Sequence, residues 1–381
     1  MTALNEIRTT LPSHWYFDPA HYERELEAIW YRDWICVGRE ESLPAPGDYF
    51  VAGIGSQSII VTRDAAGELR AFHNTCRHRG SILCREPEGR FRNGRIICPY
   101  HTWTYSTDGS LLATPGRIES DGFDAGHFSL YDVHVASWRG FIHINLSDTP
   151  QSDLETQLGD EALVVANWPF ESLRTVHREI QPVACNWKLF WENYSECYHC
   201  PRIHPELCRL MPVYRHAVLN LGDLPGWEPA HAGDTGRPRV DDNRHTWTFD
   251  GQSTLSDISG PTAEEIAAGV AFASFTASMF IVAHPDYVRT VRIVPTGPES
   301  IDLVAEWLLP ADGTTATAEQ LESILGLART VMRQDAEVCE LNQRGLHSRR
   351  HENGVLVAQE YGVWELHEWV RDRLAGYPSG D

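Results

Sequence analysis

The chain has 381 residues and a formal net charge of −21 at pH 7. A chain of this length can bury the cores of two domains. The acidic balance argues against a nucleic-acid partner, because the phosphates would be repelled. The nine cysteines are an odd number, and so long a chain does not depend on disulfides, so no disulfide framework is expected.

Neither a signal peptide nor a membrane-spanning segment is expected. Residues 1–15 have no apolar core and no small-residue cleavage site. No apolar run reaches the length needed to cross a bilayer. Sulfur ligands of a metal or cluster would need a reducing compartment, so we predict a cytoplasmic protein that does not bind membranes.

Three segments are predicted in chain order. Residues 1–45 hold a helix that begins at Asp18-Pro19, with Asp as its cap and Pro in its first turn, and that packs on the larger domain. Residues 46–150 show the signals of β-strands throughout, including apolar and polar residues in alternation. Residues 151–381 form a second domain, which opens with a strand at 175–183.

Two short motifs in the β segment each combine a cysteine with a histidine: Cys76-Arg77-His78 and Cys98-Pro99-Tyr100-His101. Two thiolates and two imidazoles suit either a tetrahedral zinc ion or a [2Fe–2S] cluster whose outer iron takes imidazoles. Turn signals at Asn93-Gly94 and Asp108-Gly109 predict that the ligands lie at the tips of β-hairpins, one of them formed by the strands that flank Asn93-Gly94. A zinc finger would place its histidines on a helix, so the cluster is favoured.

A second candidate site follows further along the chain. A helix is predicted to run through Glu196 and His199, which are three residues apart and so share one helix face. His204 lies five residues after His199, out of step with a regular helix, and the prolines nearby are expected to bend the chain and turn His204 back. Cys197 and Cys200 are interpreted as small buried apolar residues and not as a zinc-binding pair.

A carboxylate is expected to complete the second site. Two histidines and one carboxylate form a facial triad for Fe(II) that leaves positions open, although a zinc hydrolase uses similar ligands. The carboxylate is expected on a long helix predicted over 319–341. Within the apolar stripe of that helix, Asp335 is slightly favoured over Glu337 and Glu340, because a buried Asp needs a partner.

The sequence contains no glycine-rich dinucleotide fingerprint. We therefore expect the chain to have no NAD or flavin domain of its own. Electrons for any redox reaction would come from another protein.

Both sets of motifs resemble those of the Rieske non-haem iron oxygenases, in their catalytic alpha subunit. The two Cys–His motifs resemble the Rieske segment, although nineteen residues separate His78 from Cys98, slightly more than usual. Glu196-x-x-His199-x-x-x-x-His204 is similar to the motif of the catalytic iron. Gln334-Asp335, followed by 340–345, resembles the segment that supplies the third iron ligand.

The resemblance implies an α+β chain: an all-β Rieske [2Fe–2S] domain and a helix-grip catalytic domain, in which an antiparallel sheet wraps on the long helix. It assigns the cluster ligands as Cys76, His78, Cys98 and His101, and the Fe(II) ligands as His199, His204 and Asp335. Glu196 would link an iron-ligand histidine to a Rieske histidine, His101, of a neighbouring subunit, which implies a ring-shaped homo-oligomer, commonly a trimer. NAD(P)H and flavin would act only through a separate ferredoxin-type reductase.

Residues 193–200 and 340–345 are most similar to the branch that acts on quaternary ammonium compounds such as glycine betaine, and on this ground Asn193 is a candidate catalytic residue. The implied reaction uses O₂ to hydroxylate an N-methyl group and releases formaldehyde. An aromatic cage would bind the ammonium group, with candidates Trp227, Trp247, Phe249, Phe272, Phe275 and Phe280. The alternatives are hydroxylation of an aromatic ring, or an electron carrier with only the Rieske centre, against which the second motif set argues.

Overall fold

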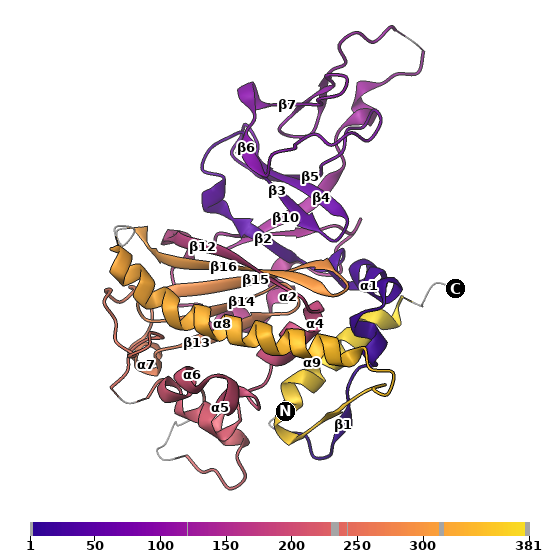
Figure 1. Cartoon of the computed structure of the whole chain (residues 1–381). Helices are drawn as coiled ribbons and strands as arrows, with labels where there is room; N and C mark the ends of the chain where they lie inside the picture. Colours follow the sequence, from indigo (N-terminus) through magenta and orange to yellow (C-terminus); the bar gives the residue numbers. More distant parts are fainter. Residues whose placement is uncertain (1–2, 120, 230–235, 242, 312–315, 378–381) are drawn as a thin grey trace. The chain divides into compact units, whose positions relative to one another are not determined.

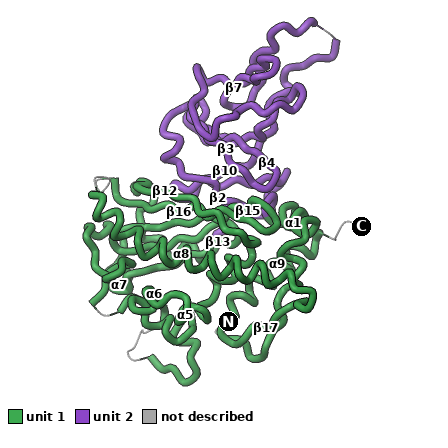
Figure 2. Tube along the Cα trace, viewed as in Figure 1, with its two compact units in different colours: residues 1–29, 159–381 green, residues 30–158 purple. Residues whose placement is uncertain are grey.

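The computed structural model describes most of the chain: residues 3–119, 121–229, 236–241, 243–311 and 316–377. The chain forms two compact units, which we describe separately (Figure 2). The smaller unit spans Trp30–Leu158, and the larger unit combines Met1–Ile29 with Gly159–Asp381. Among the described residues, no helix is long and apolar enough to cross a membrane.

The smaller unit consists mainly of antiparallel strands, as predicted. One sheet has the order β2-β11-β10-β5-β4-β3-β6, and a second, smaller sheet has the order β7-β8-β9. The elements are β2 (Ile35–Arg39), β3 (Asp48–Ile54), β4 (Gln57–Arg63), β5 (Leu69–His73), β6 (Glu88–Arg90), β7 (Arg95–Ile97), β8 (Thr104–Ser106), β9 (Leu111–Ala113), β10 (Asp132–Trp138), β11 (Phe141–Asn145) and the helix α2 (Leu154–Leu158).

Two details of this unit differ from the sequence predictions. The unit begins at Trp30 and not at 46, because β2 pairs with β11. A turn forms at Asn93-Gly94, where both residues have positive φ, but the strands on its two sides do not pair with each other. β6 pairs with β3 and β7 pairs with β8, so the predicted hairpin is wrong: the turn passes from one sheet to the other. The Asp108-Gly109 turn joins β8 and β9, as predicted.

The larger unit is built on one antiparallel sheet with the order β12-β16-β15-β14-β13. The strands are β12 (Leu173–Val183), β13 (Ala271–Phe275), β14 (Met279–Ala283), β15 (Val288–Gly297) and β16 (Ser300–Pro310). The helix α8 (Ala318–Leu346) runs across this sheet (Figure 1). Thr317 caps α8, and the apolar stripe predicted from the sequence is buried along it. The predicted α+β fold, with a helix lying on an antiparallel sheet, is confirmed.

Shorter elements complete the larger unit. They are β1 (Arg8–Thr9), which pairs with β17 (Val355–Leu356), and the helices α1 (Pro19–Glu25), α3 (Glu161–Val164), α4 (Trp187–Tyr194), α5 (Cys200–Ile203), α6 (Pro205–Leu210), α7 (Ala263–Ala268) and α9 (Tyr361–Ala375).

A fully buried ion pair joins the N-terminal segment to α4. The helix α1 begins where predicted, with the Asp18 side chain as its cap. Lys188 Nζ lies 2.6 Å from Glu25 Oε1, and it also donates to the backbone oxygen of Trp15 at 2.9 Å. Removing one partner of such a pair strands a buried charge, at a cost of roughly 3–5 kcal/mol. The N-terminal helix is therefore an integral part of the larger unit.

Candidate active site

Three predicted ligands meet in the larger unit. The ligand atoms of His199, His204 and Asp335 all lie within 4.8 Å of one another. His204 Nε2 is 2.8 Å from Asp335 Oδ1 and 3.1 Å from His199 Nε2, and the remaining distance, from His199 Nε2 to Asp335 Oδ1, is 3.5 Å. Two imidazole nitrogens and one carboxylate oxygen thus converge on a single point, as the facial arrangement of a metal ion requires.

The chain brings the two histidines together by ending a helix earlier than predicted. The helix α4 stops at Tyr194, so Glu196 and His199 lie in an irregular segment and the prediction that they share a helix face is wrong. The expected break between the histidines is confirmed: α5 ends before His204, and α6 begins after it with Pro205 in its first turn. The irregular segment allows the two rings to face each other.

Each of the three groups is oriented by a further side chain. Glu196 Oε1 accepts a hydrogen bond from His199 Nδ1 at 2.5 Å, and Gln334 Oε1 accepts one from His204 Nδ1 at 2.8 Å. Because each Nδ1 carries the proton, the lone pair of each Nε2 can point to the common centre. Asn193 Nδ2 donates to Asp335 Oδ1 at 2.8 Å. Asn193 was a candidate catalytic residue only because of the family resemblance. Its hydrogen bond to Asp335 gives its position a physical reason.

The charges in this cluster depend on one another. Burial alone would raise the pKa of Asp335, but its hydrogen bonds with His199 and His204 lower that pKa to about 2. Burial would lower the pKa of His199, but Asp335 and Glu196 raise it to about 9. The carboxylate is therefore anionic at neutral pH and attracts a proton onto the imidazole, a proton that a divalent metal would displace.

The structure separates Asp335 from the two other carboxylates considered on the same helix. Glu337 is exposed and forms an ion pair with Arg333, with a distance of 2.8 Å from Arg333 Nη1 to Glu337 Oε1. Glu340 Oε1 accepts a hydrogen bond from the backbone N–H of Ala184 at 3.1 Å. Only the geometry of Asp335 agrees with a role beside the histidines.

Cys197 and Cys200 are bonded to each other as a disulfide. Their burial is as predicted, but their interpretation as two separate apolar residues is wrong. The chain between Ser195 and His199 is not helical, and it brings the two Cα atoms to 4.9 Å. The expectation of a reducing compartment stays a prediction.

A cavity of about 1010 Å³ opens beside the three converging groups. It lies within the larger unit, between one face of the sheet and the helices α4 and α8. Three of the six predicted cage aromatics, Trp247, Phe272 and Phe280, line it, whereas Trp227, Phe249 and Phe275 do not. Tyr194, which the sequence analysis did not single out, also lines it and stacks on Phe280 with 4.0 Å between ring centroids.

In the smaller unit, the two Cys–His motifs lie in loops with the same backbone pattern. The N–H of Gly80 donates to the oxygen of Cys76, and the N–H of Cys76 donates to the oxygen of Ser81. Thr102, Cys98 and Trp103 repeat these two bonds. The fourth residue after each cysteine has positive φ, 73° at Gly80 and 58° at Thr102. The second motif lies at the tip of the β7–β8 hairpin as predicted, but the first lies in a longer loop between β5 and β6.

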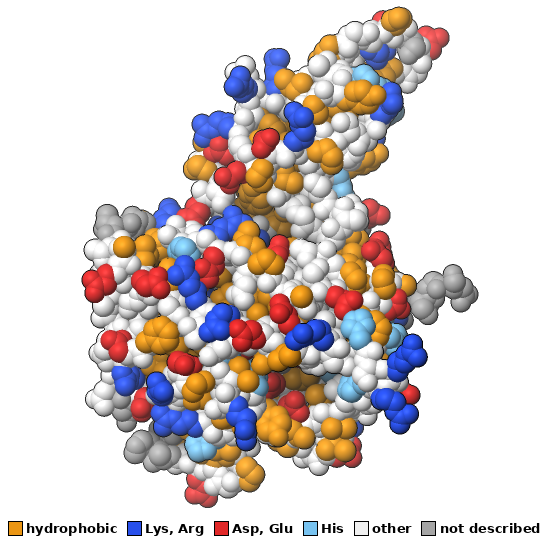
Figure 3. Space-filling view, viewed as in Figure 1, with side chains coloured by type: hydrophobic (Ala, Val, Ile, Leu, Met, Phe, Trp, Pro, Cys, Tyr) orange, Lys and Arg blue, Asp and Glu red, His pale blue; other side chains and the backbone are white. Residues whose placement is uncertain are grey.

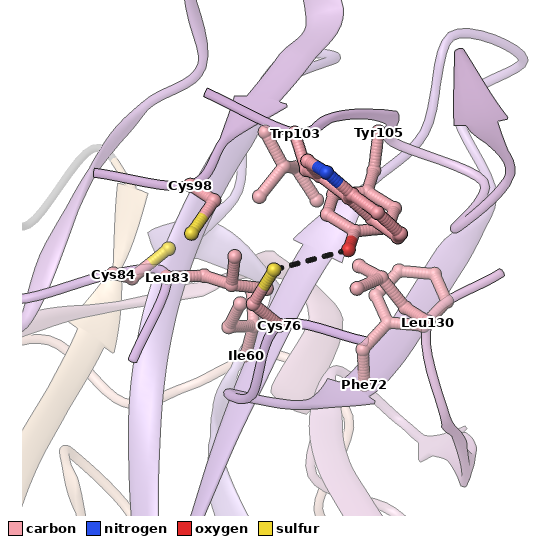
Figure 4. Close-up of a cluster of buried hydrophobic side chains, with 10 residues drawn as sticks. Ile60, Phe72, Cys76, Leu83, Cys84, Cys98, Trp103, Tyr105 and Leu130 are labelled. Atoms are coloured by element: carbon pink, nitrogen blue, oxygen red, sulfur yellow. Dashed lines mark hydrogen bonds between the residues drawn. The ribbon is translucent and has the colours of Figure 1, made fainter. Parts of the chain in front are cut away.

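The cysteines of these loops are buried, whereas His78 is exposed and His101 is half-buried. Cys76 and Cys98 belong to a buried cluster with Tyr105 (Figure 4). The Tyr105 hydroxyl accepts from the backbone N–H of Arg77 at 3.1 Å, so its proton is free for Cys76 Sγ at 3.2 Å. The rings of His78, which is exposed, and His101 lie 4.7 Å apart.

Asn74 holds the first loop in place, and the sequence analysis did not identify it. Its buried side-chain oxygen accepts hydrogen bonds from the backbone N–H groups of Leu83 and Cys84 at 3.0 and 2.8 Å. Its Nδ2 donates to the backbone oxygen of Cys84 at 2.9 Å. One buried amide therefore closes the whole segment that carries Cys76 and His78.

The arrangement of the four donors favours a two-iron cluster over a single ion. Zinc with four ligands at about 2.0–2.3 Å would bring all donors close to one another. Within the described part of the chain, the group at Asp335 is the one set of three or more such residues whose ligand atoms approach within 4.8 Å; the four residues of the smaller unit do not form another. Two buried cysteines and two more exposed histidines suit a two-iron cluster.

Comparison with known proteins gives two domain matches. Residues 33–124 match the Rieske [2Fe-2S] domain, and residues 165–376 match the ring hydroxylating alpha subunit (catalytic domain). The glycine betaine monooxygenase oxygenase subunit of Chromohalobacter salexigens is 30% identical, over 96% of this chain and 86% of that protein. Choline monooxygenase of Spinacia oleracea is also 30% identical, over 96% of this chain and 78% of that protein.

Among solved structures, the quaternary ammonium Rieske monooxygenase CntA in complex with an inhibitor has a similar fold, with a TM-score of 0.75, 23% identity and 96% coverage of both chains. The two matched domains carry a Rieske [2Fe–2S] cluster and a mononuclear iron, respectively. The donor sets fit these groups: two buried cysteines and two more exposed histidines in one unit, and two nitrogens and one oxygen converging on a point in the other. A zinc hydrolase and a simple electron carrier do not account for both domains.

Replacement of Asp335 by Ala is expected to remove the mononuclear iron and leave the visible spectrum of the cluster unchanged, because the two sites lie in separate units. Iron content should fall by one atom per chain. Glu337→Ala serves as the matched control, since it removes a carboxylate from the same helix outside the site. Loss of iron in the control and not in Asp335→Ala would refute the assignment.

The substitution His78→Cys is expected to retain a coloured cluster whose reduction potential is lower by roughly several hundred millivolts, because thiolate replaces imidazole on the outer iron. Redox titration followed by electron paramagnetic resonance would measure the shift. A potential and spectrum identical to those of the wild type would mean that His78 is not a ligand.

Proposed function

Because this chain belongs to the Rieske non-haem iron oxygenases, we propose that it is the oxygenase component that hydroxylates an N-methyl group of a quaternary ammonium compound of the glycine betaine type. The hydroxylated product would break down to a less methylated amine and formaldehyde. The cavity beside the proposed iron ligands, lined by aromatic rings, is the observation that carries this proposal.

Two lines of support favour an ammonium substrate. The relatives with 30% identity are named for glycine betaine and for choline, both of which are quaternary ammonium compounds. Tyr194 and Phe280 form a stacked pair in the cavity wall, and Trp247 and Phe272 form an edge-to-face pair with 5.6 Å between centroids. Aromatic faces attract a methylated ammonium ion through cation–π interaction. Ring hydroxylation, the alternative, has less support: the matched catalytic-domain family is named for it, but both relatives at 30% identity are named for quaternary ammonium substrates.

The reaction balances with one O₂ and two electrons. One oxygen atom enters a C–H bond of the N-methyl group, and the other leaves as water after taking up two protons. The N-hydroxymethyl product then releases formaldehyde and a proton, and the C–N bond electrons return to the amine. When bound, the cluster supplies the electrons and the mononuclear iron activates O₂.

The chain itself holds, orients and separates the reacting groups. In this proposal His199, His204 and Asp335 hold the iron, while Glu196 and Asn193 fix the orientation of two of these ligands through the hydrogen bonds described above. The apolar cavity wall excludes water from the methyl group and turns it toward the iron. Cys76, His78, Cys98 and His101 bind the cluster.

Electrons are proposed to pass between subunits. Glu196 is mostly buried, and its Oε1 already bonds to an iron-ligand histidine. His78 is exposed and His101 is half-buried, so a second copy of the chain can reach their imidazoles. A ring-shaped trimer would let Glu196 of one chain approach His101 of the next. A separate ferredoxin-type reductase, with its own flavin and NAD(P)H, would reduce the cluster.

A single-turnover experiment tests the reaction without the native reductase. Chemically reduced protein that receives O₂ and glycine betaine is expected to form formaldehyde in proportion to its reduced sites. Protein without betaine is the control. If no formaldehyde forms and an aromatic compound instead acquires a hydroxyl group under the same conditions, the ring-hydroxylation alternative replaces this proposal.

Glu196→Gln is expected to keep both metal sites and to lower turnover by about 10- to 100-fold, because an amide cannot carry the charge of the proposed bridge. Stopped-flow spectroscopy should show that the cluster is still reduced but is reoxidised slowly when substrate and O₂ are added. Normal reoxidation with full metal content would refute the bridging role.

A further inference from the structure

The cavity contains one buried charge without a partner. Arg289 lies on β15, between Val282 of β14 and Trp307 of β16 in the register of the sheet. The residue is 4% exposed and lines the cavity. Its Nη1 atom is buried without a hydrogen bond, and among the described residues the guanidinium has neither an ion pair nor a stacked ring.

A buried cation without a counter-ion is costly to the fold. Burial lowers the pKa of Arg289, and the nearby Tyr287, Tyr194 and Asp335 offset this only in part. On the face of the molecule seen in Figure 3, many Lys and Arg side chains lie beside Asp or Glu side chains. Arg289 has none within ion-pair distance, and the space in front of it is the cavity. An anion that enters the cavity would supply the missing partner.

A second polar group in the same cavity is also left unsatisfied. The hydroxyl of Tyr194 is buried and has no hydrogen bond of regular geometry among the described residues, although the Ser274 side chain lies close to it. Tyr194 and Arg289 both line the cavity; burial raises the pKa of Tyr194, and the positive charge of Arg289 opposes that shift. Glu161, which also lines the cavity, is engaged elsewhere, since its Oε2 accepts from the backbone N–H of Ser274 at 3.0 Å. The two unsatisfied groups are both hydrogen-bond donors, so they favour the same kind of ligand atom, an anionic oxygen.

We propose that the Arg289 guanidinium and the Tyr194 hydroxyl form the subsite for a carboxylate of the substrate. This inference rests on the proposed function and narrows it: the substrate is a zwitterion that carries a quaternary ammonium and a carboxylate on one short chain. The planar fork of a guanidinium matches the two oxygens of a carboxylate. A choline-type alcohol lacks this anion and would leave Arg289 buried and unpaired.

The alternation of the strands places the carboxylate subsite next to the aromatic wall. Phe272 of β13 is in register with Val282, and Val282 with Arg289, so Phe272 and Arg289 are on one row of the sheet. Phe280 is two residues before Val282 on β14 and therefore faces the same side. The stack of Tyr194 on Phe280 thus offers a ring face to the ammonium and a hydroxyl to the carboxylate.

The test separates binding of the carboxylate from the oxygenase reaction. Calorimetry on the iron-loaded protein would compare two ligands in which an uncharged carbon replaces the ammonium nitrogen. They are 3,3-dimethylbutanoate, the analogue of glycine betaine, and 3,3-dimethylbutan-1-ol, the analogue of choline. Arg289→Gln is expected to weaken binding of the acid by about 30-fold or more, and Tyr194→Phe by about tenfold. Binding of the alcohol should change by less than about twofold, because it makes no charged contact.

Matched variants control for folding. Arg178→Gln removes a charge from the same sheet, at a half-exposed side chain that pairs with Glu306 and does not line the cavity, and it should bind the acid as the wild type does. Arg289→Lys keeps the charge without the planar fork and should lie between the wild type and Arg289→Gln. Iron content and melting temperature should match across the set.

Each outcome decides one proposal. Equal losses for the acid and the alcohol, or no binding of the acid by the wild type, would overturn the carboxylate subsite. Binding of the acid through Arg289 without formaldehyde from glycine betaine would support the subsite and overturn the proposed reaction. Formaldehyde from glycine betaine with the same KM in the wild type and Arg289→Gln would support the reaction and overturn the subsite.

Discussion

The contact of Asp335 with the two histidines is the interaction on which the larger unit's chemistry depends. Asp335 lies in the apolar stripe of α8, where an isolated carboxylate would be costly to bury. His204 comes from a segment 131 positions earlier, and its ring gives that carboxylate its partner. The packing of α8 on the sheet therefore sets the position of the oxygen ligand, and the interrupted helix after α4 sets the two nitrogens. Gln334 and Asn193, from these same two elements, restrict the remaining rotations.

Three sets of buried charges in the larger unit differ in how each is neutralised. Lys188 and Glu25 neutralise each other in a space that is closed to solvent. Asp335 and the imidazoles form a set that can exchange a proton for a metal ion. The Arg289 guanidinium has no ion-pair partner in the described part of the chain. Only the charges of Lys188 and Glu25 are neutralised without a bound group. In the cavity, we expect a metal ion and the substrate to supply the remaining counter-charges.

Sequence reasoning was most successful where the signal is local. The long helix, the Asp18 cap of α1, the Asp108-Gly109 turn and the spacing of the ligand motifs were all readable in one stretch of chain. It failed where the pairing of strands determines the structure. Asn93-Gly94 forms a turn, but β6 pairs with β3 and β7 pairs with β8. The contact between Cys197 and Cys200 required a helix end that the local pattern does not mark. Asn74 is important because it is buried with hydrogen-bond partners, and Arg289 because it is buried with an unbonded Nη1. Neither property can be read from the sequence before the chain is folded.

The larger unit is discontinuous, since residues 30–158 are inserted between its first and remaining parts. Glu25 leaves the ribosome 163 positions ahead of its partner Lys188. During synthesis the smaller unit is complete while α1 still lacks the surface on which it packs, and Asp335 emerges later still. The order of the chain thus releases the whole sequence of the smaller unit before the proposed iron ligands His199, His204 and Asp335 have all emerged. The residues proposed to bind the cluster are therefore available for folding before those proposed to bind the mononuclear iron.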